Sequence, residues 1–264
     1  MISRLEVITH VYAASSLELA RGISLVEFAS SKRGAIGFST GLARVAPGAE
    51  LAYHYHECSE SITVLAGECE VAVEGRTYVL HPYDSLHVPK RVAHTVKNLD
   101  GSSDLAVHTA FSSSSVTRNP ANGSYVPSRL AEALSAEHGP ESLQRFSLAA
   151  AYELSTNAWF KDLFAGRLGA RGICGGYGRF APGTSLPCHT HLYDESITIV
   201  EGTATCLVAG RRYTLNGCDT ALVPQGLPHR FINESDQEMA MVWVYAGDEP
   251  ERVIVENRRC AEGN

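Results

Sequence analysis

The stretch "GAELAYHYHECSE" (residues 48–60) carries two histidines one residue apart, and a glutamate four residues after the second histidine. The stretch "GTSLPCHTHLYDE" (residues 183–195) repeats these residues at the same spacing, 135 residues later. With this offset, 19 of 51 positions are identical between residues 48–98 and 183–233, without a gap. Unrelated segments of ordinary composition would share roughly three positions. The chain therefore contains a duplicated domain.

Each copy has the pattern of an all-β domain. The runs "SITVLAG" (61–67) and "SITIVEG" (196–202) are β-branched and end at glycine, and many similar short runs are separated by Gly or Pro. This pattern predicts a barrel or a sandwich. We expect a first domain over residues 1–112, a connector with one helix over residues 113–145, and a second domain over residues 146–264. The segment "SSLELARG" (15–22) has the spacing of a second short helix.

The paired histidines have the geometry of metal ligands. Residues i and i+2 of a strand share a face, so His54 and His56 point the same way, and Glu60 has the same parity. His94 follows a proline turn and is expected on a neighbouring strand. An isolated H-x-H is more often structural, but here the whole set recurs as His189, His191, Glu195 and His229. Three imidazoles and a carboxylate suit Fe, Mn, Ni, Co, Cu or Zn and suit Ca or Mg poorly.

Composition excludes several classes of partner. The net charge is −7 and the sequence has no basic cluster, which argues against binding to nucleic acid or to an anionic membrane. No run of about 18 apolar residues is present, and the first residues lack a secretory apolar core. We therefore expect a cytoplasmic protein whose seven cysteines are reduced thiols.

Four further residues allow two interpretations each. Arg44 and Arg179 occupy the same place in the two copies; they would either clamp a substrate carboxylate or form ion pairs at the barrel end. His108 aligns with Trp243 at the offset of 135, and either residue would line a cavity mouth or pack in the core. The sequence identifies no catalytic acid or base besides the expected ligands, and no site for an organic cofactor.

With these motifs the chain resembles the cupin superfamily. Both copies match its first motif, G-x5-H-x-H-x3-E-x6-G, through Gly48, His54, His56, Glu60 and Gly67, and through Gly183, His189, His191, Glu195 and Gly202. The second motif, G-x5-P-x-G-x2-H-x3-N, is matched by Pro224, Gly226, His229 and Asn233, and in the first copy by Pro89, His94 and Asn98. Tyr83, Arg91 and Cys218 stand where this motif has glycine.

The resemblance implies a bicupin. Its fold would be two tandem antiparallel jelly-roll barrels with a few short helices. The two sets of three histidines and one glutamate would hold two divalent metal ions per chain. Many cupins form homo-oligomers, so we expect one here.

Fold and metal leave the reaction open. The first hypothesis is an Fe- or Mn-dependent oxygenase of dioxygenase type acting on a small oxygen-rich organic substrate. The second is non-redox metal catalysis, namely isomerisation, cyclisation, decarboxylation or hydrolysis. The third is a small-molecule-binding module without catalysis.

Overall fold

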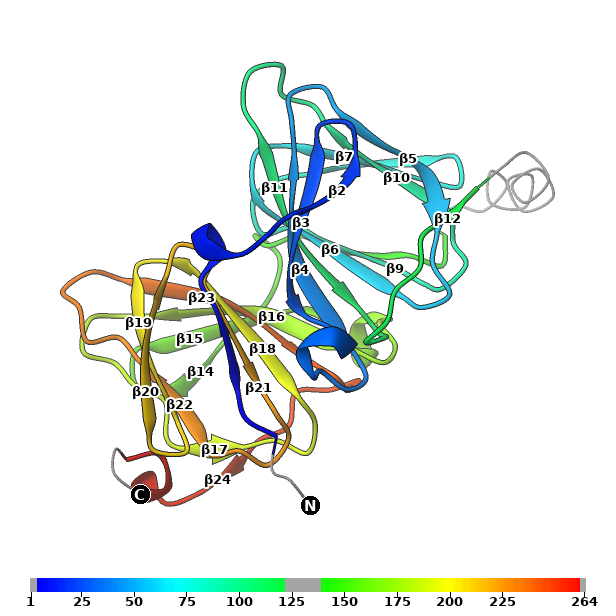
Figure 1. The fold of residues 1–264 in the computed structure, drawn as a ribbon. Helices are drawn as coiled ribbons and strands as arrows, with labels where there is room; N and C mark the ends of the chain where they lie inside the picture. The colour runs from blue at the N-terminus through cyan, green and yellow to red at the C-terminus, as the bar shows by residue number, and fades with distance from the viewer. Residues whose placement is uncertain (1–3, 122–138, 262–264) are drawn as a thin grey trace.

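The computed structural model describes residues 4–121 and 139–261. These residues form two β-barrels that lie against each other (Figure 1). All strand pairs among these residues are antiparallel. The helices of the described residues are short 3-10 turns: η1 (Val11–Ala13), η2 (Ser31–Arg33), η3 (Gly166–Leu168) and η4 (Asn257–Cys260). The all-β prediction, with two tandem barrels, is confirmed.

The first barrel combines a seven-stranded and a five-stranded sheet, in the orders β13-β9-β6-β11-β4-β3-β2 and β12-β5-β10-β7-β8. Its strands are β2 (Leu17–Ala20), β3 (Ile23–Ala29), β4 (Ser39–Val45), β5 (Glu50–Tyr55), β6 (Glu60–Ala66), β7 (Cys69–Val73), β8 (Arg76–Leu80), β9 (Ser85–Val88), β10 (His94–Asn98), β11 (Leu105–Phe111), β12 (Asn119–Pro120) and β13 (Ser142–Gln144).

The second barrel repeats this plan, with sheet orders β1-β21-β18-β23-β16-β15-β14 and β20-β19-β22-β17-β24. Its strands are β1 (Val7–Thr9), β14 (Ala151–Ser155), β15 (Ala158–Phe164), β16 (Cys174–Phe180), β17 (His189–Thr190), β18 (Glu195–Glu201), β19 (Thr203–Val208), β20 (Arg211–Asn216), β21 (Thr220–Val223), β22 (His229–Ile232), β23 (Met239–Tyr245) and β24 (Val253–Ile254).

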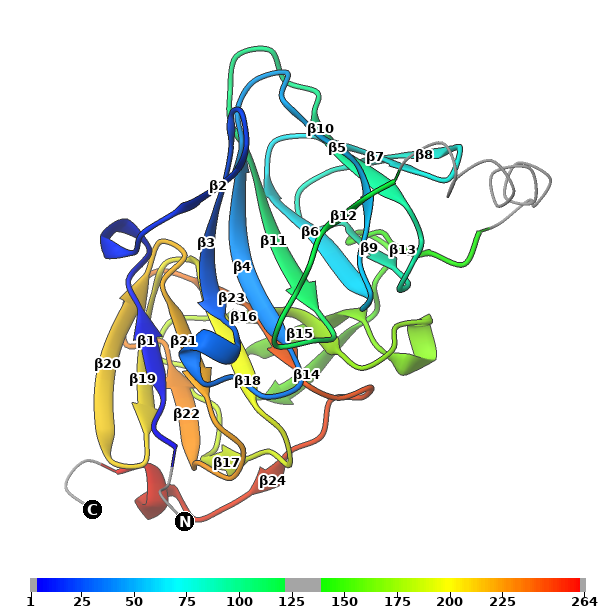
Figure 2. The same ribbon diagram turned by 45° about the vertical axis from the view of Figure 1, so that its right-hand side comes forward.

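The two barrels exchange their first strands. Strand β1, at the start of the chain, pairs with β21 of the second barrel, so it runs down the lower body in Figures 1 and 2. Strand β13 is its counterpart 135 residues later, and it pairs with β9 of the first barrel. The second barrel therefore includes β1 from residues 1–112, and the first barrel includes β13 from the connector. The domain limits at residues 112 and 145 remain a prediction.

Matching ion pairs hold the exchanged strands. The Arg76 guanidinium donates to both carboxylate oxygens of Glu141 at 2.5 and 2.8 Å. At the equivalent place Arg211 pairs with Glu6. Arg76 and Arg211 follow glycine at the same place in the two copies, 135 residues apart. They thus serve the contact between the two halves, because a bidentate ion pair fixes the orientation of its partners and also attracts them.

Two local expectations have other outcomes. The segment 15–22 was expected to be helical, but Leu17–Ala20 is strand β2, because it pairs with β3 and covers the barrel edge. Tertiary pairing overrides its helical propensity. The helix expected in the connector, around residues 128–139, falls almost wholly outside the described residues.

The interiors of the two barrels differ in kind. The buried core of the first barrel is aliphatic, with valine, leucine and isoleucine side chains. The core of the second barrel also contains aromatic rings: Phe160, Phe180, Phe231, Trp243 and Tyr245. Since both barrels have the same strands, this difference in side-chain volume decides how much space each barrel encloses.

Candidate metal centres

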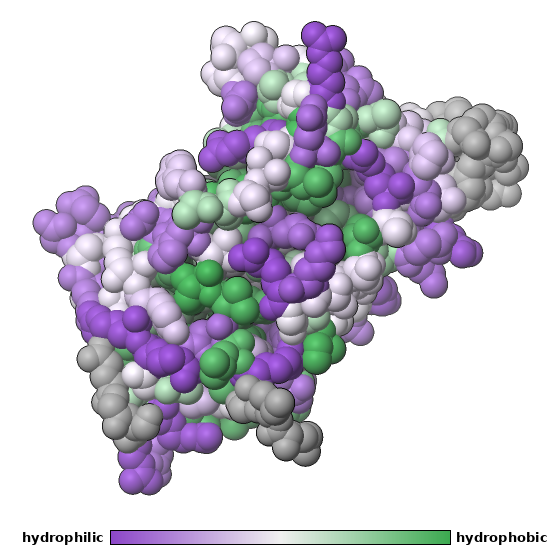
Figure 3. Space-filling model, in the orientation of Figure 1, coloured by the Kyte–Doolittle hydropathy of each residue, from purple (hydrophilic) through white to green (hydrophobic). Residues whose placement is uncertain are grey.

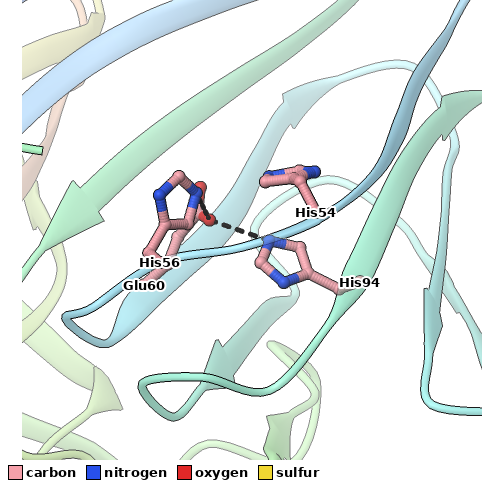
Figure 4. Close-up of side chains that lie close together, drawn as sticks. All are labelled: His54, His56, Glu60 and His94. Atoms are coloured by element: carbon pink, nitrogen blue, oxygen red, sulfur yellow. Dashed lines mark hydrogen bonds and ion pairs between the residues drawn. The ribbon is translucent and has the colours of Figure 1, made fainter. Parts of the chain in front are cut away.

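The first cluster brings together His54, His56, Glu60 and His94, all buried. Figure 4 shows that the four side chains converge. One ligand atom from each lies within 4.8 Å of those of the other three. Glu60 Oε2 lies 3.0 Å from His94 Nε2 and 3.3 Å from His56 Nε2. Four side chains at such distances can share one cation.

The strand parity used in the sequence analysis treats His54, His56 and Glu60 as parts of one continuous strand, but the structure brings them together in another way. Strand β5 ends at Tyr55, and the chain turns before β6 begins at Glu60. Strand β5 belongs to the five-stranded sheet and β6 to the seven-stranded sheet. Glu60 therefore reaches the histidines from the opposite wall of the barrel, while His94 lies directly opposite His54 on β10.

The second cluster repeats the first with His189, His191, Glu195 and His229, again buried and with ligand atoms within 4.8 Å of one another. Glu195 Oε2 lies 2.7 Å from His229 Nε2 and 3.1 Å from His191 Nε2. All eight residues singled out in the sequence are thus brought together, in two groups of four.

Hydrogen bonds orient the imidazoles for ligation. The Nδ1 atoms of His54, His94 and His56 lie 2.8, 3.1 and 2.7 Å from the carbonyl oxygens of Ala52, Val92 and Thr117. A carbonyl only accepts, so each Nδ1 carries the proton and donates it. The neutral rings then present Nε2 lone pairs to one another and to Glu60. Such a set needs a cation or a proton at its centre, and a metal fits it.

The same logic holds in the second cluster, where His189 and His229 donate Nδ1 protons to backbone carbonyls at 2.9 Å. His191 donates to the Glu251 carbonyl, which belongs to the C-terminal segment. His191 Nε2 is buried and lies 3.1 Å from Glu195 Oε2, but it makes no well-aligned hydrogen bond within the described part of the chain. An orphaned imidazole nitrogen facing a carboxylate is the position that a metal ion would fill.

Burial sets the protonation states that metal binding requires. Burial, together with the neighbouring His94, lowers the pKa of His54 to about 3 against the opposing charge of Glu60. Burial likewise lowers the pKa of His189 to about 2. Burial would raise the pKa of Glu60 and Glu195, but the adjacent imidazoles outweigh it and hold both well below the usual range. His54 and His189 are thus neutral nitrogen donors, and both glutamates are anionic. Burial also disfavours the charged form of His56, but its hydrogen bond to Glu60 outweighs burial and raises the pKa of His56, so a metal would displace that proton.

A cavity of about 420 Å³ opens onto the first cluster. Its walls are mostly apolar, with Leu25, Ile62, Val107 and Phe111 among them. Figure 3 shows apolar side chains gathered over part of this barrel, with hydrophilic side chains around them. A pocket of this size and character suits a small organic molecule.

Glu27 is a carboxylate that sequence reasoning missed. In the register of the sheet it lies opposite Gly41, which lies opposite Thr109, and Thr109 lies opposite Ile62. Residues in such a row share a face, so Glu27 faces the cavity, which it lines. Its carboxylate has no hydrogen bond or ion pair with any residue in 4–121 or 139–261. The signal was its parity with the apolar residues of "ISLVEFA".

The equivalent row of the second barrel is Asp162, Gly176, Trp243 and Ile197. Trp243 is therefore the counterpart of Thr109 rather than of His108, because the loop 234–238 is one residue shorter than 99–104. A Cβ on Gly176 would lie 2.6 Å from Trp243 Cζ2, so this glycine makes room for the indole. Thr109 instead donates a hydrogen bond of 2.6 Å to Glu60 Oε1.

The remaining candidates lie away from the cavity. Arg44 is exposed, and Arg179 forms an exposed ion pair with Glu238, so the ion-pair interpretation holds for Arg179. Trp243 is a core residue, as one of its two interpretations has it. His108 is also buried, and burial lowers its pKa to about 4.

The expectation of seven reduced cysteines is wrong for two of them. Cys188 and Cys260 form a disulfide, with Cα atoms 6.0 Å apart. The other five are free thiols. The disulfide ties the C-terminal segment to the strand that carries His189, and 72 residues separate the two cysteines. No spacing rule in the sequence would pair them.

Two tandem barrels, each with three histidines and a glutamate facing inward, define the class of duplicated β-barrel proteins with paired metal centres. The family model described as "Cupin domain" matches residues 41–111 and 176–245. The chain belongs to the cupin family and is a bicupin. No helix in the described residues is long and apolar enough to cross a membrane.

Solved structures share the fold across the whole chain. The structure of oxalate decarboxylase from Bacillus subtilis at pH 4.6 matches with a TM-score of 0.73 and 15% identity, covering 97% of this chain and 79% of that one. The formate complex of Lactobacillus farciminis oxalate decarboxylase matches with a TM-score of 0.75 and 14% identity, covering 97% and 89%. Another similar structure, also of the Bacillus subtilis enzyme, is described by its Mn(II) centres. No curated protein matches the chain in sequence.

Proposed function

We propose that this bicupin is a metal-dependent enzyme in which each four-residue cluster binds one divalent transition metal. The observation that carries the proposal is the convergence of six oriented imidazoles and two carboxylates in two buried groups. Iron, manganese, nickel, cobalt, copper and zinc all accept such donors. The Mn(II) centres of the structurally similar oxalate decarboxylase support manganese among these.

The reaction is assigned to the first barrel. Its cluster adjoins the mainly apolar cavity of about 420 Å³ within the barrel, whereas aromatic rings fill the interior of the second barrel and leave its cluster a pocket only at the barrel mouth. The cavity is mainly apolar and is larger than a two-carbon dicarboxylate needs. The substrate class is therefore a small organic molecule with oxygen donors at one end and an apolar body.

The leading reaction is oxygenation of dioxygenase type. A bound metal polarises substrate oxygens, and iron or manganese also permits reaction with dioxygen. The chain's own contribution is the apolar wall, which excludes water, and the set of neutral imidazoles, which leaves coordination positions open. Glu27 holds a carboxylate beside the substrate space, where it can accept or return a proton.

Decarboxylation without net redox change is the second candidate. It is favoured by the oxalate decarboxylases among the similar structures and by Glu27, which can supply the proton that replaces carbon dioxide. The two reactions separate cleanly, because only the first consumes dioxygen. Activity under argon, or with zinc in place of iron or manganese, would assign the chain to the second.

Metal analysis of protein purified without added metal tests the basis of both. We expect about two ions per chain, one fewer in His56→Ala and one fewer in His191→Ala. With a panel of catechols, diketones and hydroxy acids, only His56→Ala should abolish turnover. Absence of bound metal, or turnover that survives His56→Ala, would contradict the proposal.

We expect the small-molecule enzyme to act as a homo-oligomer in the cytoplasm, without nucleic acid or membrane partners. Size-exclusion chromatography with light scattering tests the oligomer directly. A strictly monomeric protein would contradict that part.

A further inference from the structure

The second barrel has its own pocket, separate from the cavity of the first. It has a volume of about 660 Å³ and lies at the mouth of the second cluster, where His191 forms part of its wall. Charged, polar and apolar side chains of the barrel and of the C-terminal segment line the rest. Within 4–121 and 139–261, no residue lines both this pocket and the first cavity.

Two of the four charged side chains that line this pocket, Asp162 and Arg167, are paired. Asp162 accepts hydrogen bonds from Arg167 and, at 2.6 Å, from the Tyr152 hydroxyl. Arg167 also pairs with Glu249 at 2.7 Å. These contacts cancel the negative charge of Asp162, the counterpart of Glu27, and occupy the Arg167 guanidinium.

Arg252 is the unpaired cation of the pocket. Its side chain is half-buried, its guanidinium carbon lies 5.8 Å from the ring centre of Phe160, and it makes no hydrogen bond or ion pair with any described residue. The neighbouring Glu251 carboxylate is exposed, so water screens its charge. A half-buried guanidinium without an anion presents its planar set of donors to a ligand.

The segment that carries Arg252 is fixed in place. Glu251 N donates to the Tyr193 hydroxyl at 2.5 Å, and β24 pairs with β17 directly after Arg252. The Cys188–Cys260 disulfide closes the same segment onto the barrel. Because the backbone that carries Arg252 is held in place before a ligand binds, binding costs little entropy for ordering this segment.

We propose that Arg252 and the second cluster form a binding site for a small carboxylate anion. A divalent metal held by three neutral imidazoles and one carboxylate keeps a net positive charge, and Arg252 adds a second one on the same pocket wall. The proposal rests on the metal-binding part of the proposed function and is independent of the reaction.

Acetate is the probe. It is titrated by calorimetry into the metal-loaded full chain, wild type and Arg252→Gln, with Arg258→Gln as the matched control on the same segment. We expect acetate to bind at the second cluster, with an affinity that is at least about tenfold lower in Arg252→Gln, as loss of a charge-assisted pair implies, and unchanged in Arg258→Gln. Arg252→Lys keeps the charge but loses the planar donors, so its affinity should be intermediate.

Three results would contradict the proposed binding site. The first is no acetate binding by the wild type at concentrations up to about 100 mM, far above an ordinary millimolar Kd. The others are equal affinity in the wild type and Arg252→Gln, or equal losses of affinity in Arg252→Gln and Arg258→Gln. Metal content and thermal midpoint are measured for every variant. A chain that holds two metals but ignores acetate refutes only this inference, whereas a chain without metal refutes the proposed function itself.

Discussion

The two barrels share a strand plan and a ligand set, yet they use their interiors in opposite ways. At one position of the same register row, the first barrel has Thr109 and the second has Trp243. The threonine leaves a cavity and supports Glu60, whereas the indole fills the barrel. Both copies have thus kept the metal clusters, while a few side chains decide that the first barrel encloses a cavity and that the second has an aromatic core.

Removing the indole tests this contrast most severely. Trp243→Ala should destabilise the chain by about 4 kcal/mol, because it deletes a fully buried aromatic side chain and leaves a cavity. Urea unfolding measures the loss. Trp159→Ala is the control, since that side chain is 47% exposed, and its cost should stay near 0.5 kcal/mol or below, roughly the range of surface changes. Equal costs for the two variants would show that the second barrel is not built around its aromatic core.

The next test concerns the two segments that hydrogen-bond to a cluster histidine, here called straps: the segment around Thr117 in the first barrel and the segment around Glu251 in the second. In the first barrel the His56 ring donates to Thr117, and in the second the His191 ring donates to Glu251 at the equivalent place. Only the second strap carries a disulfide. Cys260→Ser should cost about 3 kcal/mol of unfolding free energy and should weaken metal binding at the second cluster alone.

Metal retention against a chelator, read together with urea unfolding, checks this expectation. Cys58→Ser, which removes a free thiol, is the control. Loss of metal from both clusters in Cys260→Ser would mean that the straps are not independent.

The sequence predicts the fold and all eight clustered residues because both depend on local spacing that is written twice. The parity of His54 and His56 and the turn before His94 need no long-range information. The exchange of β1 and β13, the disulfide and the match of Thr109 to Trp243 do need it. Strand pairing across 215 residues leaves no local signal, as Val7 opposite Leu222 shows. A one-residue deletion in loop 234–238 conceals the match to Trp243.

Thr109 itself allows a smaller test. Thr109→Val keeps the side-chain shape but removes the 2.6 Å hydrogen bond to Glu60 Oε1. A hydrogen bond to a charged group contributes about 2 kcal/mol, so stability should fall by that order and metal should leave the first cluster more readily. Metal release followed by a chromogenic chelator checks it. Unchanged release from the first cluster would show that the threonine does not support Glu60.

The smallest expected effect comes from backbone strain at the second cupin motif. Arg91 has φ +64° where its counterpart Gly226 has φ +79°, so both copies keep the left-handed turn although only one has glycine. A side chain in this region costs about 1 kcal/mol. Arg91→Gly should therefore raise the thermal midpoint by about 2 °C, less what the exposed ion pair with Glu57 contributes. Gly226→Arg should lower the midpoint by a similar amount. If both substitutions shifted the midpoint in the same direction, the left-handed turn would not be the common constraint that places His94 and His229.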